Sequence, residues 1–436
     1  MRKYVLVIGA GLLSATMWLW VQDIAIVRQQ QEAAVNGSPR GLLSDLYPRW
    51  LGARELLLHR RDPYGGDVTR RIQTGYYGRP IDPSRPSDPK DQQAFAYPLY
   101  VVFLLAPTVN LPFAVVQRGF FWLLVALSAA SVVLWMRAIG WRTSILEKLA
   151  WILLVFGCFP VVQGLKLQQL TLLVGALLAA STAAIVRRHL VWAGILLALA
   201  TIKPQLVILF ALWLLIWVLG NWRERQSLMW TFLVSMGVLV VASELLLPGW
   251  IGEFRAAAAS YYQYTGGGQS VLDILLTPMV GRVAAAMLAI AGLIAVWRHR
   301  KAAATTGDFQ WSMALVLSIT LLCIPMPVPY NQVILLAPVV LVAHNIGALW
   351  ARTRLLQFCL IGTGVLLFWP WIAALFLVSA MPVMPSTIVQ KEWALPLYTT
   401  LTLPVSLLVL LLAGRKVLCK ENGSGQKTIG EFAPEG

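Results

Sequence analysis

The sequence predicts an all-α polytopic membrane protein of about twelve transmembrane helices, whose first extracytoplasmic loop is long and carries surface helices. Three observations support this fold class. Of the 436 residues, 58% are hydrophobic and only 12% are charged, whereas about one-quarter of a soluble domain is charged. The mean hydropathy is +0.70. The basic residues form short clusters between apolar segments, as the positive-inside rule requires, so the net charge of +16 does not indicate nucleic-acid binding.

The cysteines and histidines show no disulfide or metal-ligand spacing. Cys158, Cys323 and Cys359 lie in apolar segments and Cys419 lies in the C-terminal tail, so no CxxC pair occurs. The four histidines are dispersed, and no HExxH pattern is present.

The N-terminal segment reads as an uncleaved first span. Arg2 and Lys3 precede an apolar run over residues 4–26. This run is long for the hydrophobic region of a signal peptide and is not followed by a small-x-small cleavage site. We therefore expect a cytoplasmic N-terminus and a first transmembrane helix that ends near Val27.

Residues 28–96 form the first loop, outside the cell, with eleven basic and eight acidic residues. Within it, apolar and basic residues recur at helical spacing over residues 47–61, which predicts an amphipathic helix on the outer membrane surface. Asp45 lies at or just before the start of this helix, and Asp62-Pro63-Tyr64 ends it.

The remaining chain alternates between apolar spans and short polar turns. Residues 97–112 are too few to cross, and they contain several prolines, so we expect them to dip into the membrane and return. The predicted spans after the first are 114–136, 149–162, 170–186, 190–202, 206–219, 228–247, 281–297, 311–324, 332–349, 355–376 and 396–413.

This topology places every short basic cluster on the cytoplasmic face. It predicts one transmembrane domain over residues 1–413, a disordered cytoplasmic tail over residues 414–436, and a multi-pass location in the inner (plasma) membrane with both termini inside.

Asp45 is the first candidate for chemistry. An acid just outside a membrane face, in a chain of many spans, is a candidate catalytic base. The alternative is a helix N-cap or turn residue, a role that aspartate favours.

Lys203 is the second candidate. It interrupts a long apolar stretch and is followed by Pro204, which breaks the helix there. A lysine at such a break suits a phosphate, although a lysine that snorkels to the interface is equally compatible. Lys166 has the same two interpretations, with snorkelling favoured.

The predicted topology brings other polar and aromatic residues to the same outer face. The aromatic residues are most simply an interfacial belt, although they could stack on sugar rings. The polar group comprises Asp45, Lys166, Gln168, Gln169, Lys203, Gln205, Gln269, Ser270, Tyr330 and Asn331, and the aromatic group comprises Tyr97, Trp250, Tyr261, Tyr262 and Tyr264.

The chain resembles the GT-C superfamily of integral-membrane glycosyltransferases, because it has a leading span, an outer loop that opens with an acid, and many further spans. The closer resemblance, over about residues 1–350, is to glycosyltransferase family 87, the polyprenol-phosphate-mannose-dependent mannosyltransferase-like proteins. The residues that carry it are Asp45-Leu46-Tyr47 with Ala53, Asp62-Pro63-Tyr64, Phe95-Ala96-Tyr97-Pro98, Gly164 with Gln168 and Gln169, Ala193-Gly194 before Lys203-Pro204, and Gln269-Ser270.

The resemblance implies a GT-C-like bundle and transfer of a hexose, with mannose as the expected sugar. The donor would be a polyprenyl-phosphate sugar, the acceptor a hydroxyl of a glycan or glycolipid at the extracytoplasmic face, and the reaction inverting and independent of metal or cofactor. Asp45 takes the position of the general base, and no DxD pair lies near it. Many members of the mannosyltransferase branch carry a histidine in the turn that here reads Pro329-Tyr330-Asn331-Gln332.

On this hypothesis Lys203 and Lys166 bind the donor phosphate. Substrate contacts are expected from Arg54, Tyr97, Gln168, Gln169, Gln269, Ser270, Tyr330 and Asn331. Two other classes remain open. A transporter or lipid flippase predicts internal repeats and midplane charges, which are not evident here. A polysaccharide ligase or polymerase would have its large outer loop late in the chain.

Overall fold

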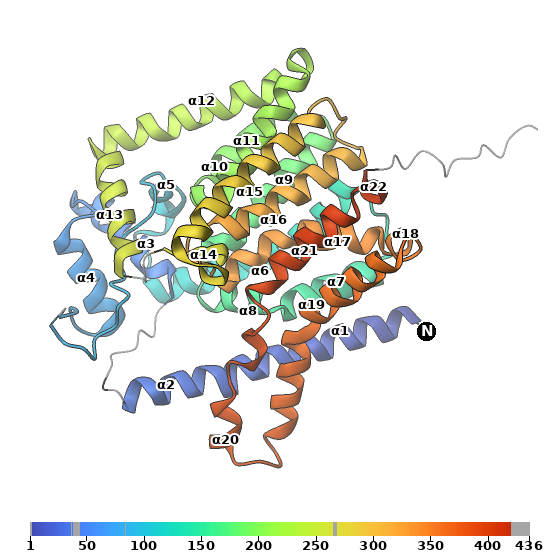
Figure 1. The fold of residues 1–436 in the computed structure, drawn as a ribbon. Coiled ribbons are helices and arrows are strands. Elements are labelled where there is room, and N and C mark those ends of the chain that lie inside the picture. The colour runs from blue at the N-terminus through green and yellow to red at the C-terminus, as the bar shows by residue number, and fades with distance from the viewer. Residues whose placement is uncertain (1, 36, 38–43, 83, 265–267, 420–436) are drawn as a thin grey trace, which may run out of the picture.

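The computed structural model describes residues 2–35, 37, 44–82, 84–264 and 268–419, and every regular element within them is helical. Figure 1 shows the chain as a bundle of long helices, with α3 (Leu46–His59), α4 (Gly66–Tyr77), α5 (Val101–Leu105) and α13 (Trp250–Tyr264) gathered at one end. The N-terminus, α18 (Ile346–Trp350) and α22 (Arg415–Leu418) lie at the other end. The all-helical membrane class predicted from the sequence is confirmed.

Six described helices are long and apolar enough to cross a membrane: Lys3–Val35, Phe113–Ile139, Trp222–Leu246, Pro278–Arg298, Arg354–Ala380 and Ser386–Ala413. A bent helix pair could add a seventh. Five further apolar helices are shorter, at Leu170–Val186, Leu190–Ala200, Pro204–Gly220, Gly307–Cys323 and Pro329–His344. The expected number of twelve spans therefore stays a prediction.

The centre of the bundle is α16 (Gly307–Cys323), which is buried along almost its whole length from Phe309 to Leu322. The helices that contact it most extensively are α11 (Pro204–Gly220), α15 (Pro278–Arg298), α17 (Leu336–His344) and α21 (Thr402–Ala413). A helix enclosed on all sides has no solvated polar face. The side chains of its buried polar residues instead donate to backbone carbonyl oxygens: Gln310, Ser312, Ser318 and Thr320.

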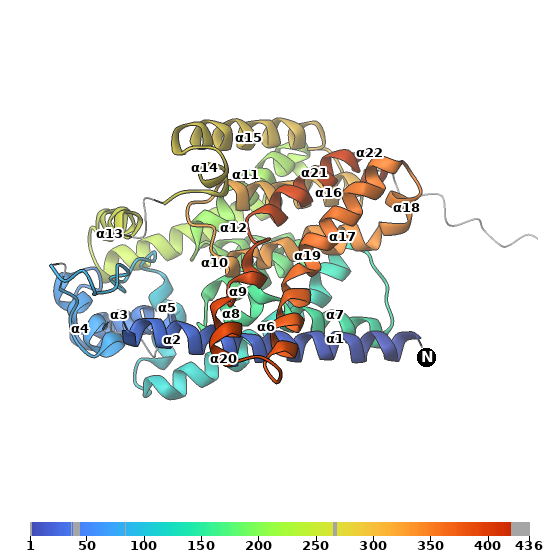
Figure 2. The same cartoon turned by 60° about the horizontal axis from the view of Figure 1, so that its bottom comes forward.

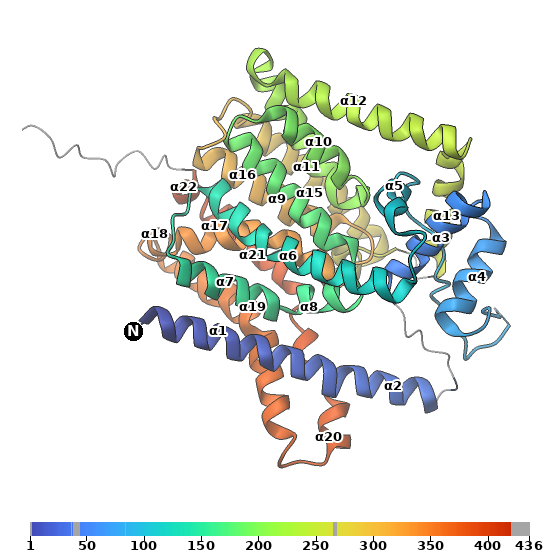
Figure 3. The same cartoon turned by 180° about the vertical axis from the view of Figure 1, so that it is seen from behind.

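The first helix is longer than expected. Instead of ending near Val27, α1 (Arg2–Leu19) continues through a π-helical turn (Trp20–Ala25) into α2 (Ile26–Val35). The polar residues that follow Val27 are good helix formers, and Arg28 pairs with Glu32 one turn later at 2.8 Å. α1 packs along α7 (Ile145–Gly157), as Figure 3 shows from behind.

The span expected over residues 149–162 is broken. α7 ends at Gly157, and α8 (Phe159–Lys166) departs at an angle of 63°. Pro160 lies in the first turn of α8, where a residue without an N–H group is tolerated but cannot continue the preceding helix. The turn after α8 contacts the residue before α3, where the backbone N–H of Asp45 donates to the carbonyl oxygen of Leu167.

The helix expected to begin at Leu228 is α12 (Trp222–Leu246), which begins six residues earlier. Arg225, which the sequence suggested was a loop residue, is buried and donates to the carbonyl oxygens of Trp217 at 2.6 Å, Arg300 at 2.8 Å and Ala302 at 2.9 Å. These bonds join two basic turns and satisfy the charged side chain. Figure 2 shows α12 leading into α13 at the end that carries α3 and α4.

The helix expected over residues 47–61 exists as α3, and one face of it packs into the protein while Leu58 and His59 are exposed. Its expected position on the outer membrane surface stays a prediction. Leu46, Trp50, Ala53 and Leu56 are buried on α3, and a Cβ on Gly52 would meet the Phe95 ring at 2.4 Å. α3 is therefore part of the protein core at this end of the bundle.

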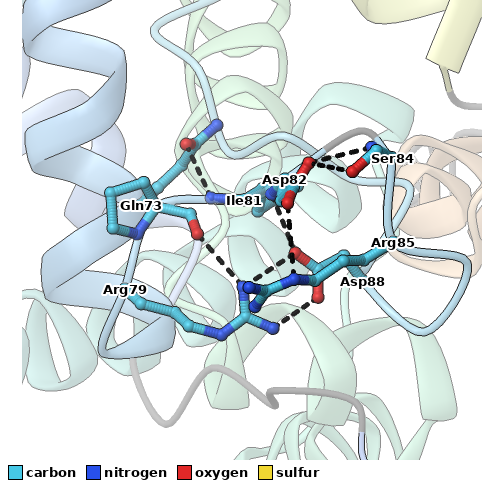
Figure 4. Close-up of polar contacts among 8 residues, drawn as sticks. Gln73, Arg79, Ile81, Asp82, Ser84, Arg85 and Asp88 are labelled. Carbon is cyan, nitrogen blue, oxygen red and sulfur yellow. Dashed lines mark hydrogen bonds and ion pairs between the residues drawn. The ribbon is translucent and has the colours of Figure 1, made fainter.

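The polar loop after α4 is ordered by its own charges. Figure 4 shows the Arg79 guanidinium donating to the Asp88 carboxylate, which also accepts from the backbone N–H of Asp82 at 2.8 Å. The Asp82 carboxylate accepts in turn from Ser84 and pairs with Arg85 at 3.3 Å. This loop leads into Phe95–Pro98, and the segment expected to dip into the membrane forms only α5 and a 3-10 turn (Ala106–Thr108).

Two expectations concern the C-terminal segment. Residues Arg415–Leu418, predicted as part of a disordered tail, form α22, and the carbonyl oxygen of Leu418 would lie 2.2 Å from a Cβ on Gly307 of α16. Residues 420–436, also predicted as disordered tail, lie outside the described residues.

Candidate active site

Asp45 holds the N-cap position of α3, but its carboxylate does not cap the helix: no side-chain hydrogen bond to the first turn is present. Instead, the Gln169 side-chain amide donates to Asp45 Oδ2. The backbone N–H of Asp45 donates to the carbonyl oxygen of Leu167 at 3.1 Å. The carboxylate is thus directed away from the structural role that aspartate usually has at this position.

The turn between α8 and α9 (Leu170–Val186) makes both contacts to Asp45. Gln168 within it has a φ of 45°, in the left-handed region that costs energy for a residue with a side chain. Its amide nitrogen donates to the carbonyl oxygen of Leu165 at 2.5 Å. This conformation places Gln169, buried, between Asp45 and the centre of the bundle.

Lys203 reaches the same place from the break between α10 (Leu190–Ala200) and α11, and it is buried. Its ammonium group donates to Gln169 Oε1 at 2.9 Å and to Thr171 Oγ1 at 2.5 Å. The Thr171 hydroxyl donates to Asn331 Oδ1 at 3.2 Å. The ammonium also lies 4.9 Å from the centre of the Tyr330 ring, a cation–π contact.

Arg49 is a site residue that the sequence reasoning missed. It lies one helical turn after Asp45 on α3 and donates from Nη1 to the Asp45 carbonyl oxygen at 2.7 Å. Its guanidinium lies 4.6 Å from the centre of the Tyr97 ring. Within the described residues, its buried Nε–H has no hydrogen-bond partner. The spacing of an acid and an arginine four residues apart could have indicated a shared helix face.

These side chains surround a cavity of about 150 Å³, which we call the polar cavity. α13, which covers part of it, supplies two tyrosines that the sequence singled out as belt or stacking residues, Tyr261 and Tyr262. Asp45 lies next to the cavity, joined to its wall by Gln169. The lining consists of Arg49, Ala96, Tyr97, Pro98, Gln169, Ile202, Lys203, Pro204, Gln205, Phe254, Ala258, Tyr261, Tyr262, Pro325, Met326, Val328, Tyr330 and Asn331.

The surroundings of Asp45 set its protonation. Burial raises the pKa of the Asp45 carboxyl above its usual range, and the nearby Asp91 carboxylate adds to the rise. Arg49, the Gln169 hydrogen bond and Lys203 act in the opposite direction but do not cancel the effect of burial. A carboxylate with a raised pKa is a stronger base than an exposed one.

Besides Asp45, which lies next to the polar cavity, five predicted site residues do not line it. Lys166 donates to Gln22 on the first helix and faces Trp18, 5.4 Å from its ring centre. Arg54 lies 5.4 Å from the Trp50 ring centre, and Gln168 accepts from Gln117.

The other two lie at the start of α14 (Val271–Leu275). The Gln269 carbonyl accepts from Met326, and Ser270 caps α14 in a reciprocal bond pair with Asp273. The structure therefore joins Tyr97, Gln169, Lys203, Tyr330 and Asn331 around one cavity and leaves these five apart.

Among the described residues, one group of three could ligate a metal ion: His299, Asp308 and Cys419. It belongs to the end of the bundle opposite Asp45, where α16 begins and α22 ends. His299 Nδ1 lies 2.9 Å from Asp308 Oδ1, and the Arg415 guanidinium lies 3.0 Å from His299 Nε2. A cation there would compete with the arginine, so we assign this cluster to packing.

A second cavity, of about 360 Å³, lies between α7, α17, α19 (Arg354–Ala380) and α21 and is lined almost entirely by apolar side chains. We call it the apolar cavity. The 3-10 segment Pro329–Leu335 contributes to both cavities, with Tyr330 and Asn331 on the polar one and Pro329, Gln332 and Val333 on the apolar one. Residues 97–112, which we expected to dip into the membrane, do not line it.

Comparison with protein families gives one match, to the model described as glycosyltransferase family 87, over residues 95–325. Comparisons with curated proteins and with solved structures give no match. The matched segment covers more than half of the chain. It contains Tyr97, Gln169 and Lys203 and ends at Pro325, which lines the polar cavity. This membrane protein therefore belongs to glycosyltransferase family 87.

Proposed function

We propose that the chain transfers a hexose, with mannose as the first candidate, from a polyprenyl-phosphate donor to an acceptor hydroxyl at the extracytoplasmic face, with inversion and without a metal. The observation that carries this proposal is the set of contacts that the Asp45 side chain makes. Asp45 holds a helix N-cap position without capping and is hydrogen-bonded instead beside a cavity that two cations line.

Asp45 acts as the general base. The acceptor hydroxyl gives its proton to the carboxylate while its oxygen forms a bond to C1 of the sugar. The bond from C1 to the phosphate oxygen breaks, its electron pair stays on that oxygen, and polyprenyl phosphate leaves. Attack from the face opposite the phosphate inverts the anomeric centre. Proton removal by a positioned base contributes about two to four orders of magnitude in rate.

Arg49 and Lys203 stabilise the negative charge that grows on the leaving phosphate. Both are buried and line the polar cavity, where a fixed cation acts in a lower dielectric than in water. The rigid guanidinium fork suits the phosphate oxygens, whereas the ammonium acts as a point charge. The roles predicted from the sequence for Lys166, Arg54, Gln168, Gln269 and Ser270 stay predictions.

The apolar cavity supports a lipid-linked donor. A long isoprenoid chain attached to a phosphate needs an apolar channel that begins within a few ångströms of the cations. Pro329–Leu335 separates the two cavities and contributes to the wall of each. The chain of the donor would occupy the apolar cavity while its phosphate sugar occupies the polar one.

The proposed orientation of the protein in the membrane rests on the distribution of its basic residues. The basic turns predicted as cytoplasmic meet at the end opposite Asp45: Arg415 contacts His299, and the backbone of Arg300 packs against Gly220. The positive-inside rule then assigns that end to the cytoplasm of the cell inner membrane and the Asp45 end to the outside.

The test uses purified protein in lipid nanodiscs with a panel of radiolabelled polyprenyl-phosphate sugars and acceptor membranes. Wild type is expected to move label into a new product, and Asp45→Asn to bind donor but lose transfer by at least two orders of magnitude. Asp67→Asn, on the exposed surface of α4, is the matched control and should retain full activity. Near-normal turnover in Asp45→Asn would refute the base assignment. Absence of both binding and transfer for every donor would favour a transporter or lipid flippase.

A further inference from the structure

Gln169 lies between the two charged groups of the site. One end of its amide donates to the Asp45 carboxylate, and the other end accepts from the Lys203 ammonium at 2.9 Å. Gln169 and Lys203 are both buried. The two charges are therefore connected through a neutral side chain.

This arrangement allows only one orientation of the amide. An ammonium group can only donate and an ionised carboxylate can only accept, whereas an amide has one end of each kind. If the Gln169 amide were flipped, its NH₂ group would face Lys203 and its oxygen would face Asp45. Lys203 therefore fixes which end of Gln169 meets Asp45.

Lys203 is itself held in place. Thr171 accepts from its ammonium at 2.5 Å and donates to Asn331 at 3.2 Å. In the part of the chain that the structure describes, neither Lys203 nor Asp45 belongs to an ion pair. The link from Lys203 to Asp45 is therefore made by hydrogen bonds through Gln169.

The absence of a direct contact between Lys203 and Asp45 affects how strong a base Asp45 is. A direct ion pair with a lysine would lower the pKa of an aspartate by about one to three units and make it a weaker base. The amide orients the carboxylate with one hydrogen bond and stands between it and the Lys203 ammonium group. Gln169 engages oxygen Oδ2. Among the described residues no hydrogen bond to Oδ1 is found, so we assign Oδ1 to the acceptor hydroxyl.

We infer that Gln169 and Lys203 are positioning residues, in which Lys203 orients the Gln169 amide and the amide orients the Asp45 carboxylate for proton transfer. This inference rests on the proposed function, because it gives Asp45 the role of base. It adds a second role for Lys203, distinct from its charge toward a phosphate.

The inference predicts a pH effect with a definite sign. The charged or titratable groups around Asp45 are Arg49 on its own helix, Asp91 on the outer loop, Lys203, and the tyrosines Tyr77, Tyr97, Tyr261 and Tyr330. Removing the Gln169 donor leaves all of these in place. The pKa of Asp45 then rises, because a hydrogen bond to the ionised form has been lost.

The experiment compares wild type with Gln169→Leu, Lys203→Met and the double variant. Gln117→Leu is the matched control, because its amide contacts Gln168 and not Asp45. The first readout is the pH profile of kcat/KM. The second is labelling of Asp45 by the apolar reagent dicyclohexylcarbodiimide, which modifies protonated carboxyls and is followed by mass spectrometry, so that it needs no turnover.

Gln169→Leu is expected to shift the acid limb of kcat/KM and the labelling midpoint about one unit to higher pH. Its kcat should fall more than its KM rises. Lys203→Met should shift the acid limb and the labelling midpoint in the same direction. It should add less in the Gln169→Leu background than in wild type, because only the loss of its charge, and no longer its hold on the amide, then acts on Asp45. Gln169→Glu still accepts a hydrogen bond from Lys203 but repels Asp45 when ionised. It should therefore shift the acid limb of kcat/KM and the labelling midpoint at least as far as Gln169→Leu does.

Additive effects of Gln169→Leu and Lys203→Met on the labelling midpoint, or no shift in Gln169→Leu, would overturn the inference. Thermal unfolding of each variant identifies any that fail to fold. A shifted labelling midpoint with no glycosyl transfer by wild type would instead refute the proposed function, so the two failures are distinguishable.

Discussion

The Arg49 guanidinium lies 4.6 Å from the centre of the Tyr97 ring and donates to the carbonyl oxygen of Asp45 at 2.7 Å. Arg49 therefore links α3, which carries Asp45, to the segment before α5. Tyr97 is fixed from the other side, because its carbonyl oxygen accepts from the Tyr64 hydroxyl at 2.7 Å. The arginine is held by contacts that a lysine cannot reproduce.

Arg49→Lys is expected to raise the KM for the donor about tenfold, because it keeps the charge but loses a charge-assisted hydrogen bond and the contact with Tyr97. Arg49→Ala should raise it further. The measurement is initial rate against donor concentration at fixed acceptor. Arg118→Lys, an exposed arginine on α6 (Phe113–Ile139), is the control and should match wild type. A KM unchanged in Arg49→Lys would remove Arg49 from the donor site.

The pH dependence of wild type provides a second test. The reactive form of Asp45 is the carboxylate, and burial raises the pKa of Asp45. Transfer should therefore decline as the pH falls through this raised pKa, so that the acid limb lies above the usual value for aspartate of about 3.9. The measurement is kcat/KM from pH 4 to 9, with activity recovered on return to neutral pH as the check against unfolding. A rate that is constant down to pH 4 would contradict this assignment.

The fold class could be predicted from composition and charge because a bilayer imposes apolar helices and a one-sided charge distribution. The exact ends of the helices could not be predicted in this way. Arg225 suggested a loop, yet it is buried inside a longer helix because three carbonyl oxygens satisfy it. The bend at Cys158 depends on how Pro160 packs in the first turn of α8, which periodicity does not encode.

For the site, the sequence indicated residues that are unusual in an apolar chain: Asp45, Lys203 and Gln169. It missed Arg49, because arginines are numerous in the first loop and only tertiary contacts distinguish the buried one. It also grouped Lys166 with Lys203, since both lie in outer turns. Their separation follows from the 63° bend before α8, which brings Lys166 to the first helix.

A third prediction concerns the support of the site. A Cβ at Gly52 of α3 would lie 2.4 Å from the ring of Phe95, which is fully buried. Gly52→Ala should therefore destabilise the protein by about 1–3 kcal/mol through overpacking and reduce kcat by displacing the Phe95–Pro98 segment. Gly362→Ala lies inside α19 where nothing is within 4 Å of the added atom, so it should not destabilise the protein and should gain about 0.5–1 kcal/mol of helix propensity. The measurement is thermal unfolding in detergent, and equal midpoints for the two variants would contradict the packing argument.

The last prediction tests the apolar cavity. Gly364 lines it and Gly362 does not, although both lie on α19 and neither has an atom within 4 Å of an added Cβ. Gly364→Trp should therefore fill the cavity without a backbone clash, while Gly362→Trp places the same side chain on the exposed face of the helix.

If the isoprenoid chain of the donor occupies the apolar cavity, Gly364→Trp will raise the KM for a long-chain polyprenyl-phosphate sugar and leave a short-chain analogue almost unaffected. Each buried methylene group contributes about 0.8 kcal/mol. If the tryptophan excludes two methylene groups of the donor from the cavity, the affinity for the donor should fall more than tenfold. Gly362→Trp should behave as wild type with both donors. Equal effects of Gly364→Trp on long and short donors would assign the cavity to packing alone, because a structural defect does not depend on the length of the donor chain.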